Sequence, residues 1–421
     1  EDVADSEQGK QHVLPPVDHS QTAYEPVRMQ FYTQHEDIAR LTEAEVREHR
    51  THLGIGTSGE DVSPAVCAWA HLSFPEPVID VLRSKGFTQP TPVQCQVLPC
   101  ALEGRDVVGV TETGGGKTLA FLIPLLVHAK DQRKVEKKEG PIGLVLCPTR
   151  ELALQIEKEG AQFCKALGGL RSLPVVGGLS KQEQYAALRR GVEVAVCNPG
   201  RLIDIVKKKG TNLRRVTYVV LDEVDRMLEK AFQAEVLSIL QNIRPCRQTL
   251  LFSATMPAKI KSKSSDLLCR PVWITLEKVN ARPSGISQHG ILLADEASKW
   301  QWMTAEIAGI LAEGQLLVFV NTKALADELA RKLQELQHST AVLQGDLDQA
   351  ERLAQLARFR RREALVLVAT DVASRGLDIP AVRTVLSYEV ARDVETHTHR
   401  VGRTGRAGAK GSATTLVARG D

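Results

Sequence analysis

Residues 111–118, TETGGGKT, place a run of glycines directly before a lysine and a hydroxyl side chain. The apolar run 107–110 precedes them and an apolar helical pattern follows, so the sequence predicts a strand, a glycine-rich turn and a helix. Backbone N–H groups at such a helix N-terminus form a cradle for phosphate. In this arrangement Lys117 can reach the β- and γ-phosphates of a nucleotide, and the Thr118 hydroxyl can ligate Mg²⁺. The simpler alternative is a glycine-rich turn capped by Thr118.

A pair of carboxylates, Asp222 and Glu223, directly follows the apolar run 218–221. A carboxylate at the end of a strand beside a phosphate cradle completes the Mg²⁺ shell, and a second one can polarise the attacking water. We therefore assign Asp222 to the metal and Glu223 to the water, with ATP and Mg²⁺ as the expected cofactors. Without the glycine-rich loop upstream, a solvated turn would explain the acidic pair equally well.

The strands that must position these groups are short apolar runs separated by helical patterns. In the first part of the chain they are residues 107–110, 143–147, 193–197, 218–222 and 249–252. Each is apolar on consecutive residues, which is typical of strands buried on both faces of a parallel sheet. The amphipathic segments between them supply crossover helices. We therefore expect a doubly wound α/β fold, in which ligands bind beyond the carboxyl ends of the strands.

A second series of apolar runs follows at residues 290–293, 316–320, 341–343, 365–369, 382–387 and 413–417. A chain of 421 residues is also too long for one ordinary core, so we expect two α/β domains in tandem. The predicted parts are an N-terminal extension at 1–65, a first domain at 66–276, a hinge-like linker with proline and glycine at 277–288, and a second domain at 289–421.

The overall composition is typical of a globular protein and excludes little else. The formal net charge is only +3, so an interaction with nucleic acid must be argued from local motifs. No apolar run reaches membrane-spanning length, and the acidic start is unlike a signal peptide. The eight cysteines form no CxxC pair and several lie inside apolar runs, so we expect reduced core thiols rather than disulfides or a zinc site.

From about Trp69 to the C-terminus, the motifs taken in order resemble the DEAD-box family of superfamily 2 helicases. The set comprises GFTQPTPVQ (86–94), the glycine-rich loop, PTRELA (148–153), NPGR (198–201), DEVD (222–225), SAT (253–255), ATDVASRGLDI (369–379) and HRVGRTGR (399–406). The resemblance implies two RecA-like domains with parallel sheets that close around ATP and single-stranded RNA. It also implies an ATP-dependent RNA helicase, in which RNA-stimulated hydrolysis is coupled to closure and to local unwinding or remodelling of RNA.

Several nucleotide ligands follow from this resemblance. It assigns Gln94 to the edge of the adenine and Trp69, which lies 17 residues before Gly86, to stacking on the base. A half-buried core indole is the alternative for Trp69. It assigns Arg403 and Arg406 to the phosphates during hydrolysis as arginine fingers, with a surface charge run as the alternative. The remaining implied nucleotide ligands are Thr113, Gly114, Gly115, Gly116, Gly376 and Asp378.

The resemblance also implies an RNA-binding surface with contacts mostly to phosphates and 2′-hydroxyls. Its residues are Thr149, Arg150, Gly178 and Arg201 in the first domain and Thr322, Gly345, Arg352 and Thr370 in the second. For Arg150, a structural ion pair is an equally good interpretation. The residues implied to couple the domains are Asp225, Ser253, Thr255 and His399. A helix N-cap is the alternative for Ser253 or Thr255.

Within the family, stretches such as 31–42, 211–227 and 391–408 look most like a splicing-associated member that accompanies the splicing factor 3b complex. This implies a nuclear protein of pre-mRNA splicing, with a cytoplasmic location as the alternative. It also implies spliceosomal partners, RNA of little sequence preference, no membrane and a monomeric core. Thr111 and Gly115 stand where the family's phosphate loop usually has alanine and serine. Three consecutive glycines cost backbone entropy when the loop orders. They favour a second hypothesis, a slow-turnover ATP-gated RNA clamp or annealing factor.

Overall fold

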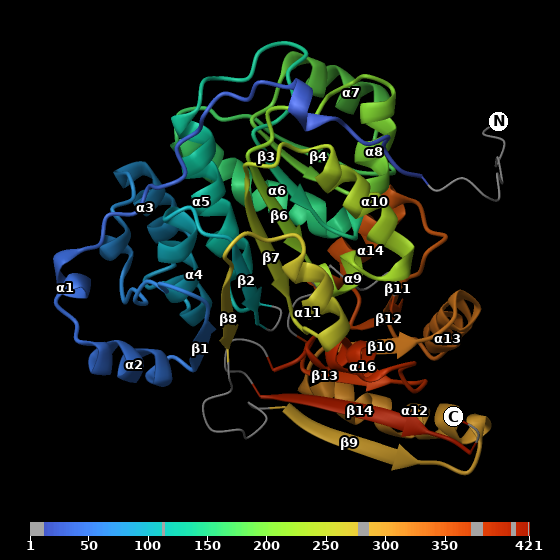
Figure 1. Cartoon of the computed structure of the whole chain (residues 1–421). Helices are drawn as coiled ribbons and strands as arrows, with labels where there is room; N and C mark the ends of the chain where they lie inside the picture. The colour runs from blue at the N-terminus through green and yellow to red at the C-terminus, as the bar shows by residue number, and fades with distance from the viewer. Residues whose placement is uncertain (1–11, 112–113, 277–285, 372–381, 406–409, 420) are drawn as a thin grey trace. The chain divides into compact units, whose positions relative to one another are not determined.

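The structure is a computed structural model that describes residues 12–111, 114–276, 286–371, 382–405, 410–419 and 421. The chain divides into two compact units between Val279 and Asn280, and each unit is built around one sheet (Figure 1). No helix within these described ranges is long and apolar enough to cross a membrane. The two α/β domains that the alternation of apolar runs predicted are therefore present.

The first unit contains an eight-stranded sheet in the order β1-β8-β2-β7-β6-β3-β5-β4. Neighbouring strands are parallel except β1 and β8, which pair antiparallel. The strands are β1 (Ile55–Ser58), β2 (Val107–Val110), β3 (Gly143–Leu146), β4 (Ser172–Val175), β5 (Val194–Cys197), β6 (Tyr218–Asp222), β7 (Gln248–Ser253) and β8 (Val272–Leu276). The helices are α1 (Glu36–Ala39), α2 (Glu43–His52), α3 (Glu76–Ser84), α4 (Pro92–Leu102), α5 (Lys117–Asp131), α6 (Arg150–Ala166), α7 (Lys181–Arg190), α8 (Pro199–Lys207), α9 (Val224–Met227), α10 (Lys230–Gln241) and α11 (Ala258–Ser265), with the 3₁₀ turns η1 (His19–Gln21) and η2 (Trp69–Leu72).

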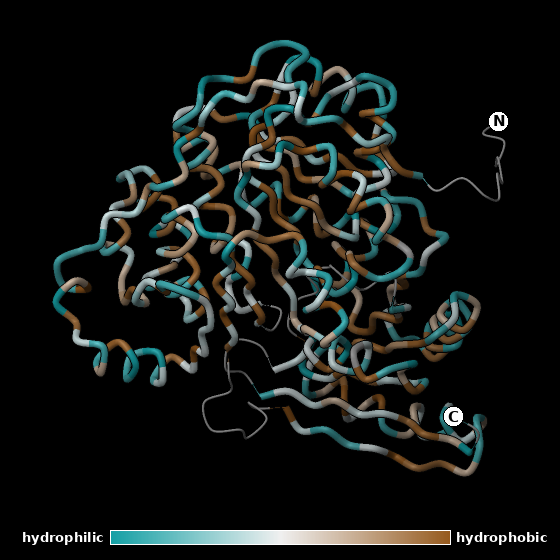
Figure 2. Tube along the Cα trace, viewed as in Figure 1, coloured by the Kyte–Doolittle hydropathy of each residue, from teal (hydrophilic) through white to brown (hydrophobic). Residues whose placement is uncertain are grey.

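The strands of the first sheet are buried on both faces. Along β2, Val107 belongs to one apolar cluster and Val108 to another, and along β3 the neighbours Leu144 and Val145 divide in the same way. The centre of the sheet is largely brown in Figure 2, whereas the outer loops are largely teal. Burial on two sides explains why these runs are apolar on consecutive residues.

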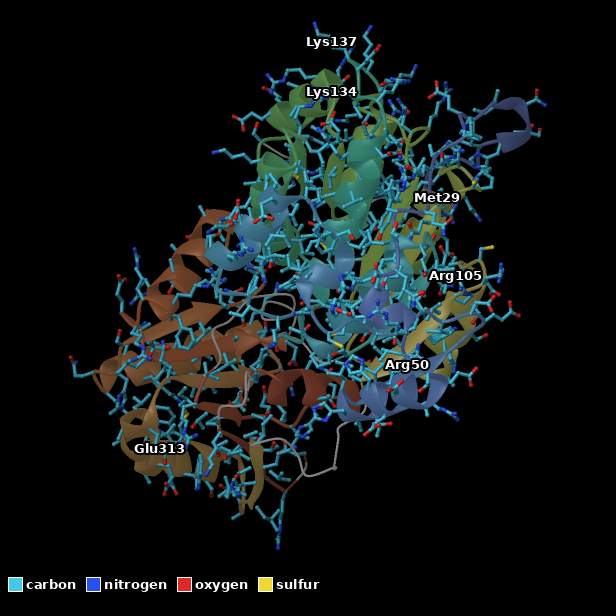
Figure 3. The ribbon with its side chains drawn as sticks, turned by 90° about the vertical axis from the view of Figure 1, so that its left-hand side faces the viewer. Met29, Arg50, Arg105, Lys134, Lys137 and Glu313 are labelled. Atoms are coloured by element: carbon cyan, nitrogen blue, oxygen red, sulfur yellow. The ribbon has the colours of Figure 1, made fainter. Side chains whose placement is uncertain are left out.

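The second unit contains a six-stranded parallel sheet in the order β11-β12-β10-β13-β14-β9. Its strands are β9 (Ile286–Leu292), β10 (Leu316–Val320), β11 (Thr340–Leu343), β12 (Val366–Thr370), β13 (Thr384–Ser387) and β14 (Gly411–Val417). Its helices are α12 (Glu296–Glu313), which carries Glu313 of Figure 3 at its end, α13 (Lys323–Glu335), α14 (Gln349–Arg360) and α16 (Val394–Val401). The strand β9 begins inside the segment expected as a linker, and residues 277–285 lie outside the described residues.

The N-terminal residues are part of the first unit rather than a separate extension. The strand β1 pairs with β8, with Ile55 opposite Leu276 and Ser58 opposite Trp273. The expectation that residues 1–65 stand apart from the core was therefore wrong for β1. An antiparallel edge strand is defined by its distant partner, which a short and partly polar run does not reveal.

Residues 12–32 form a strap along the first unit. Leu14 is buried and its N–H donates to the Ser238 hydroxyl at 3.1 Å. The N–H groups of Phe31 and Tyr32 both donate to the carbonyl of Leu102, at 2.6 and 3.1 Å. These bonds hold the strap to α10 at one end and to α4 at the other.

Side chains labelled in Figure 3 fasten the same region to the core. Arg50 of α2 donates to Gln96 Oε1 at 2.9 Å and to the carbonyls of Val62 and Ser63 at 3.1 and 2.8 Å. Arg105 reaches the carbonyl of Arg270 at 3.0 Å. The strap, α2 and the strand β8 are thus tied to α4 and β2, which precede the phosphate loop.

His128 of α5 lies at the centre of this packing. It is 1% exposed, its Nε2 lies 2.8 Å from Thr217 Oγ1, and its ring packs against Phe31 and Tyr218. Burial, together with the positive charge of Arg244, lowers the pKa of His128 to about 4. The native unit therefore holds this histidine neutral where an unfolded chain would protonate it.

We expect acid to destabilise the first unit through His128. Between pH 6.5 and 4 the unfolded state binds a proton that the native state does not, so stability falls as the pH is lowered. The shift corresponds to about 2–3 kcal/mol at pH 4.5. The His128→Gln variant lacks this proton uptake, so the difference in urea midpoint between wild type and variant should shrink from pH 7 to pH 4.5. Parallel loss of stability by both proteins would contradict this assignment.

Candidate functional site

The phosphate loop connects β2 to α5 and requires glycine at two described positions. Gly114 and Gly116 have φ of 87° and 91°, a left-handed conformation that other residues rarely adopt. A Cβ atom on Gly116 would also lie 2.5 Å from Thr91 Oγ1 and 2.7 Å from Gln94 Nε2. Thr113, an expected nucleotide ligand, lies outside the described residues.

The charged groups predicted for phosphate and metal meet at the carboxyl ends of β2 and β6. Lys117 is 8% exposed and its Nζ donates to the carbonyl of Thr111 at 3.1 Å. Asp222 is also buried, and its Oδ1 accepts the N–H of Glu223 at 3.0 Å. Burial raises the pKa of Asp222 to about 6, while Lys117 acts to lower it and Glu223 to raise it. A buried carboxylate whose negative charge is only partly balanced by Lys117 is suited to a divalent cation. Thr118, the other expected ligand, follows Lys117 in the first turn of α5.

Glu223 follows the strand in a left-handed conformation, with φ of 56°. This conformation is unusual outside glycine and asparagine, and such strain concentrates at functional sites. It turns the chain sharply between β6 and α9, so that Glu223 occupies the N-cap position of that helix. The structure thus brings Lys117, Asp222 and Glu223 together, as the sequence predicted.

Gln94 contacts the phosphate loop directly. Its Oε1 accepts the N–H of Thr91 at 2.9 Å, and its Nε2 donates to the carbonyl of Gly116 at 2.9 Å. The Thr91 hydroxyl donates to the carbonyl of Gly115 at 2.8 Å. The start of α4 is therefore a capping box that also fixes the phosphate loop. Each polar atom of the Gln94 amide makes one of these bonds and keeps one further donor or acceptor position, which can face an adenine edge.

The structure places Trp69 in the core rather than at an open face. Its indole is 7% exposed and its Nε1 donates to the carbonyl of Phe87 at 2.9 Å. This burial favours the core-indole interpretation over stacking on the base for Trp69. Phe87, which the sequence analysis did not single out, is 38% exposed and is held by that hydrogen bond. The sequence signal for an exposed ring at this place was the position of Phe87 directly after Gly86, which forms a turn.

The residues predicted to bind RNA in the first unit lie together at the ends of β3, β4 and β5. A Cβ atom on Gly177 would lie 2.8 Å from the Arg150 guanidinium, and Arg201 Nη1 donates to the carbonyl of Leu179 at 3.3 Å. Gly178, in sequence between Gly177 and Leu179, is exposed with φ of 78°. The pKa of Arg201 is lowered, first by burial and also by the nearby charge of Arg150. Two neighbouring guanidinium groups and a bare backbone favour an anion at this place.

Thr149 and Asn198 order the loops that carry these arginines. The Thr149 hydroxyl caps α6 by accepting the N–H of Leu152 at 3.4 Å. Asn198 Nδ2 donates to the carbonyl of Cys147 at 3.0 Å, which ties the loop after β5 to the end of β3. Thr149 is therefore placed by capping, with its side chain largely buried.

The residues of the first unit that are predicted to couple the domains form one hydrogen-bonded chain. The Thr255 hydroxyl donates to Asp225 Oδ2 at 2.8 Å, and the Thr255 N–H donates to the Ser253 hydroxyl at 3.3 Å. The Ser253 carbonyl accepts the N–H of Thr111 at 3.0 Å. The phosphate loop and the acidic turn are thus linked through the end of β7.

In the second unit, three of the four predicted RNA residues, Thr322, Gly345 and Thr370, lie at or just after strand ends. Thr322 caps α13 by accepting the N–H of Leu325 at 3.3 Å, and Thr370 is the buried last residue of β12. Gly345 lies beside Lys323, whose Nζ is paired with Asp346. Arg352 lies on α14. Gly376 and Asp378 lie outside the described residues.

Arg400, which no prediction singled out, is the polar centre of the second unit. It is 1% exposed, and its Nε and Nη2 each lie 2.7 Å from a carboxylate oxygen of Asp371. It also donates to Asn321 Oδ1 at 2.7 Å and to the carbonyl of Glu389 at 2.6 Å. Its neighbour Arg403 is buried as well, 3% exposed. The arginine-rich motif therefore has a structural member, and a surface charge run does not describe it.

The other two members of this motif differ in what the structure records. His399 lies on α16 and is partly buried, directly before Arg400. Arg406, the second predicted arginine finger, lies outside the described residues. The roles of Arg403, Arg406 and His399 thus stay predictions.

Among the described residues, His35, Asp37 and His71 are a further group whose ligand atoms lie within 4.8 Å of one another. The His71 Nδ1, however, accepts the N–H of Cys67 at 3.2 Å. In the neutral ring its Nε2, which faces Asp37 at 3.9 Å, then carries the proton. A metal-ligating imidazole has the opposite arrangement, so this group is not prepared for a metal ion.

A glycine-rich loop between a parallel strand and a helix, with buried acidic groups two strands away, defines the first unit as a P-loop nucleotide-binding fold. The family model described as DEAD/DEAH box helicase matches residues 91–262. The model described as helicase conserved C-terminal domain matches residues 298–408. The chain belongs to the DEAD-box family of RNA helicases, and the predicted pair of RecA-like domains is confirmed.

Similar proteins agree with this assignment over nearly the whole chain. The chain is 47% identical over 404 residues to "ATP-dependent RNA helicase DDX42" of Homo sapiens, covering 96% of this chain and 43% of that protein. It is 44% identical over 402 residues to "DEAD-box ATP-dependent RNA helicase 24" of Arabidopsis thaliana, covering 95% of this chain and 53% of that protein. The chain thus spans about half the length of these relatives, or less.

Solved structures share the fold. The RNA helicase Prp28 from Chaetomium thermophilum, bound to ADP, is 34% identical with a TM-score of 0.51, over 92% of this chain and 93% of that one. Dbp5 of S. cerevisiae, bound to RNA and ADP BeF3, is 27% identical with a TM-score of 0.73, over 83% of this chain and 89% of that one.

We expect Gly116→Ala to abolish nucleotide binding, whereas Gly115→Ser should be tolerated. At Gly116 a side chain meets Thr91 and Gln94 and is forced into a left-handed conformation, which costs about 1–2 kcal/mol before any clash. Gly115 has no positive φ. Binding of a fluorescent ATP analogue to both variants checks this. Equal binding by the two variants would show that the loop geometry is not required.

We expect Arg400→Ala to destabilise the second unit by about 3 kcal/mol, because it leaves Asp371 without its bidentate partner. The exposed Arg392, close by in sequence, serves as the control, and Arg392→Ala should change stability by less than about 0.5 kcal/mol. Urea unfolding of both variants measures the difference. Similar midpoints for the two variants would contradict a structural role for Arg400.

Proposed function

We propose that this chain is the core of an ATP-dependent RNA helicase that couples RNA-stimulated ATP hydrolysis to closure of its two units and to local remodelling of RNA. The observation that carries the proposal is the meeting of Lys117, Asp222 and Glu223 at one edge of the first sheet, beside the pair Arg150 and Arg201. Nucleotide and RNA phosphates would thus bind to neighbouring loops of the same sheet edge.

The nucleotide site uses groups that are held in place by the protein itself. Lys117 exchanges its bond to the Thr111 carbonyl for the β- and γ-phosphates. Mg²⁺ supplies positive charge at the phosphates, and Asp222 with Thr118 would hold it. Glu223, turned out of β6 by its left-handed backbone, orients and polarises the attacking water.

The adenine would lie beside the loop that begins α4. Phe87 offers an exposed ring for stacking, and the hydrogen bond from Trp69 Nε1 holds the Phe87 carbonyl in place. Gln94 can keep one N–H on the Gly116 carbonyl while its second N–H faces the base edge. Base recognition by Gln94 is thereby linked to the conformation of the phosphate loop.

Hydrolysis would require both units, since Arg403 and Arg406 belong to the second unit and their phosphate target belongs to the first. An arginine finger contributes about 10³–10⁵ in rate, or roughly 4–7 kcal/mol. Because ATP and RNA both favour the closed arrangement, each should tighten binding of the other. The sequence-tolerant contacts expected of phosphate and 2′-hydroxyl recognition fit RNA of little sequence preference.

A nuclear role in pre-mRNA splicing, with spliceosomal partners, remains part of the proposal and rests on likeness. One similar solved structure, 30% identical with a TM-score of 0.56, is that of the yeast DEAD-box splicing factor Prp28. A slow-turnover RNA clamp or annealing factor is the second candidate, because three consecutive glycines, two of them left-handed, must be ordered around the phosphates.

Phosphate release with and without RNA distinguishes the two candidates. We expect RNA to stimulate the wild type, and Glu223→Gln to lower the stimulated rate by about 10²–10⁴-fold while nucleotide and RNA still bind. Lys117→Ala, which removes phosphate contact, is the control for lost binding. If the wild type and Glu223→Gln release phosphate equally slowly with RNA present, the enzyme is excluded and the clamp is favoured.

A further inference from the structure

Exposed lysine and arginine side chains gather where the strands of the first sheet begin. They come from residues 130–138 before β3, residues 189–190 before β5 and residues 207–214 before β6, a surface that we call the basic edge. Every lysine in these fully described segments is exposed, whereas Asp131 and Glu136 are their only exposed acidic residues. A chain with a formal net charge of +3 thus concentrates positive charge at one place.

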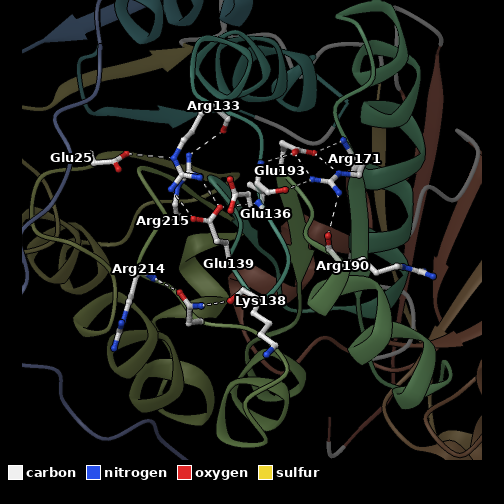
Figure 4. Close-up of polar contacts among 12 residues, drawn as sticks. Glu25, Arg133, Glu136, Lys138, Glu139, Arg171, Arg190, Glu193, Arg214 and Arg215 are labelled. Atoms are coloured by element: carbon white, nitrogen blue, oxygen red, sulfur yellow. Dashed lines mark hydrogen bonds and ion pairs between the residues drawn. The ribbon is translucent and has the colours of Figure 1, made fainter.

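Hydrogen bonds join the three segments into one surface, and Figure 4 shows the one that the Lys138 carbonyl accepts. The N–H of Lys138 donates to the carbonyl of Arg189 at 2.9 Å, and Asn212 Nδ2 donates to the carbonyl of Lys138 at 3.0 Å. The Tyr185 hydroxyl, on α7, donates to the carbonyl of Lys208 at 3.3 Å. These bonds hold the three backbone segments together, so their charged side chains share one surface.

The carboxylates inside this framework are engaged by arginines rather than by the lysines. Glu139 accepts from Arg133 at 2.7 and 2.9 Å and from Arg215 at 3.0 Å. The Arg133 hydrogen bonds hold the pKa of Glu139 down to about 2. Glu193, 2% exposed, pairs with Arg171 at 2.7 Å. The ion pairs of Figure 4 therefore build the surface and leave the lysine charge facing outward.

Helix dipoles explain only part of this pattern. Lys130, Arg189, Arg190 and Lys207 lie in the last turns of α5, α7 and α8, where positive charge complements the helix C-terminus. Residues 134–138 and 209–214 lie outside helices, and Lys134 and Lys137 project away from the ribbon in Figure 3. A further reason is needed for the lysines of these loops.

The basic edge is separate from the candidate site. The phosphate loop, the arginines Arg150 and Arg201, and the acidic turn all follow strands, whereas the basic edge precedes strands of the same parallel set. Four residues of strand span about 13 Å. The basic edge and the candidate site therefore lie at opposite ends of the strands.

The chemistry of the basic edge fits a phosphate backbone better than a protein. Protein interfaces are depleted in lysine and use large apolar anchors, whereas nucleic-acid interfaces are polar and strongly positive. Among the described residues of the first unit, the exposed large apolar side chains are Val17, Phe87 and Leu179, and they lie outside the three segments. The ammonium group is a point charge with no demand on base identity.

We propose that the basic edge binds the phosphate backbone of an RNA segment that continues beyond the part held at the candidate site. The proposal rests on RNA as the ligand of the proposed function and adds a second phosphate-binding surface to it. The second surface would hold a long strand to the first unit without selecting its sequence.

The triple variant Lys134→Gln, Lys137→Gln, Lys138→Gln tests this in the whole chain. The triple variant should bind a short single strand of roughly 10 nucleotides with the same affinity as the wild type, because one RNA-binding site covers a strand of about this length. A strand several times longer should bind roughly tenfold more weakly at low salt. Since each phosphate contact to a single strand contributes about 0.7 to the salt slope, the slope should fall by about 2.

The control is Arg40→Gln, Arg47→Gln, Arg83→Gln, which removes the same charge from exposed positions on or next to α1, α2 and α3. Equal long-strand affinity and salt slope for the two triple variants would overturn the proposal. So would loss of poly-glutamate binding with unchanged long-strand binding, which would assign the basic edge to an acidic protein. Failure of the wild type to bind the short strand would instead count against the proposed function.

Discussion

The buried charges of Lys117 and Asp222 impose the constraint on which the first unit depends. A lysine and a carboxylate tolerate burial only where partners surround them. The carboxyl ends of β2 and β6 provide such a place, and β7 between them contributes Ser253, whose carbonyl fixes Thr111. The apolar strands are buried on both faces up to this edge, so the charged groups are held by the same core that stabilises the sheet.

Loops without a core of their own are positioned by hydrogen bonds to carbonyl groups. Thr91 and Gln94 bind the carbonyls of Gly115 and Gly116, and Trp69 binds that of Phe87. Through α4 these contacts connect to the N-terminal strap, which bonds the carbonyl of Leu102. The strap at residues 12–32 thereby supports the nucleotide loop through its bonds to α4.

The two edges of the first sheet differ because every crossover helix runs against the strands it connects. Helix N-termini, small residues and buried charges meet at the carboxyl edge, where backbone N–H groups are available to anions. Helix C-termini meet at the opposite edge, where positive side chains are favoured and where the loop lysines add to them. One topology thus gives two surfaces that attract phosphate by different means.

The sequence by itself determined the parallel strands and the motifs at their ends: the predicted runs 107–110, 218–222 and 316–320 coincide with β2, β6 and β10. Continuous apolar runs and glycine-rich turns are local signals, so no distant partner is needed to read them. Only the tertiary structure decided that β1, β4 and β8 complete the first sheet, that Trp69 is buried while Phe87 is exposed, and that Arg400 is a core residue. The pairing of edge strands and the burial of side chains depend on contacts between residues far apart in the chain. The residue type alone therefore does not decide whether an aromatic ring or a guanidinium group is buried or exposed.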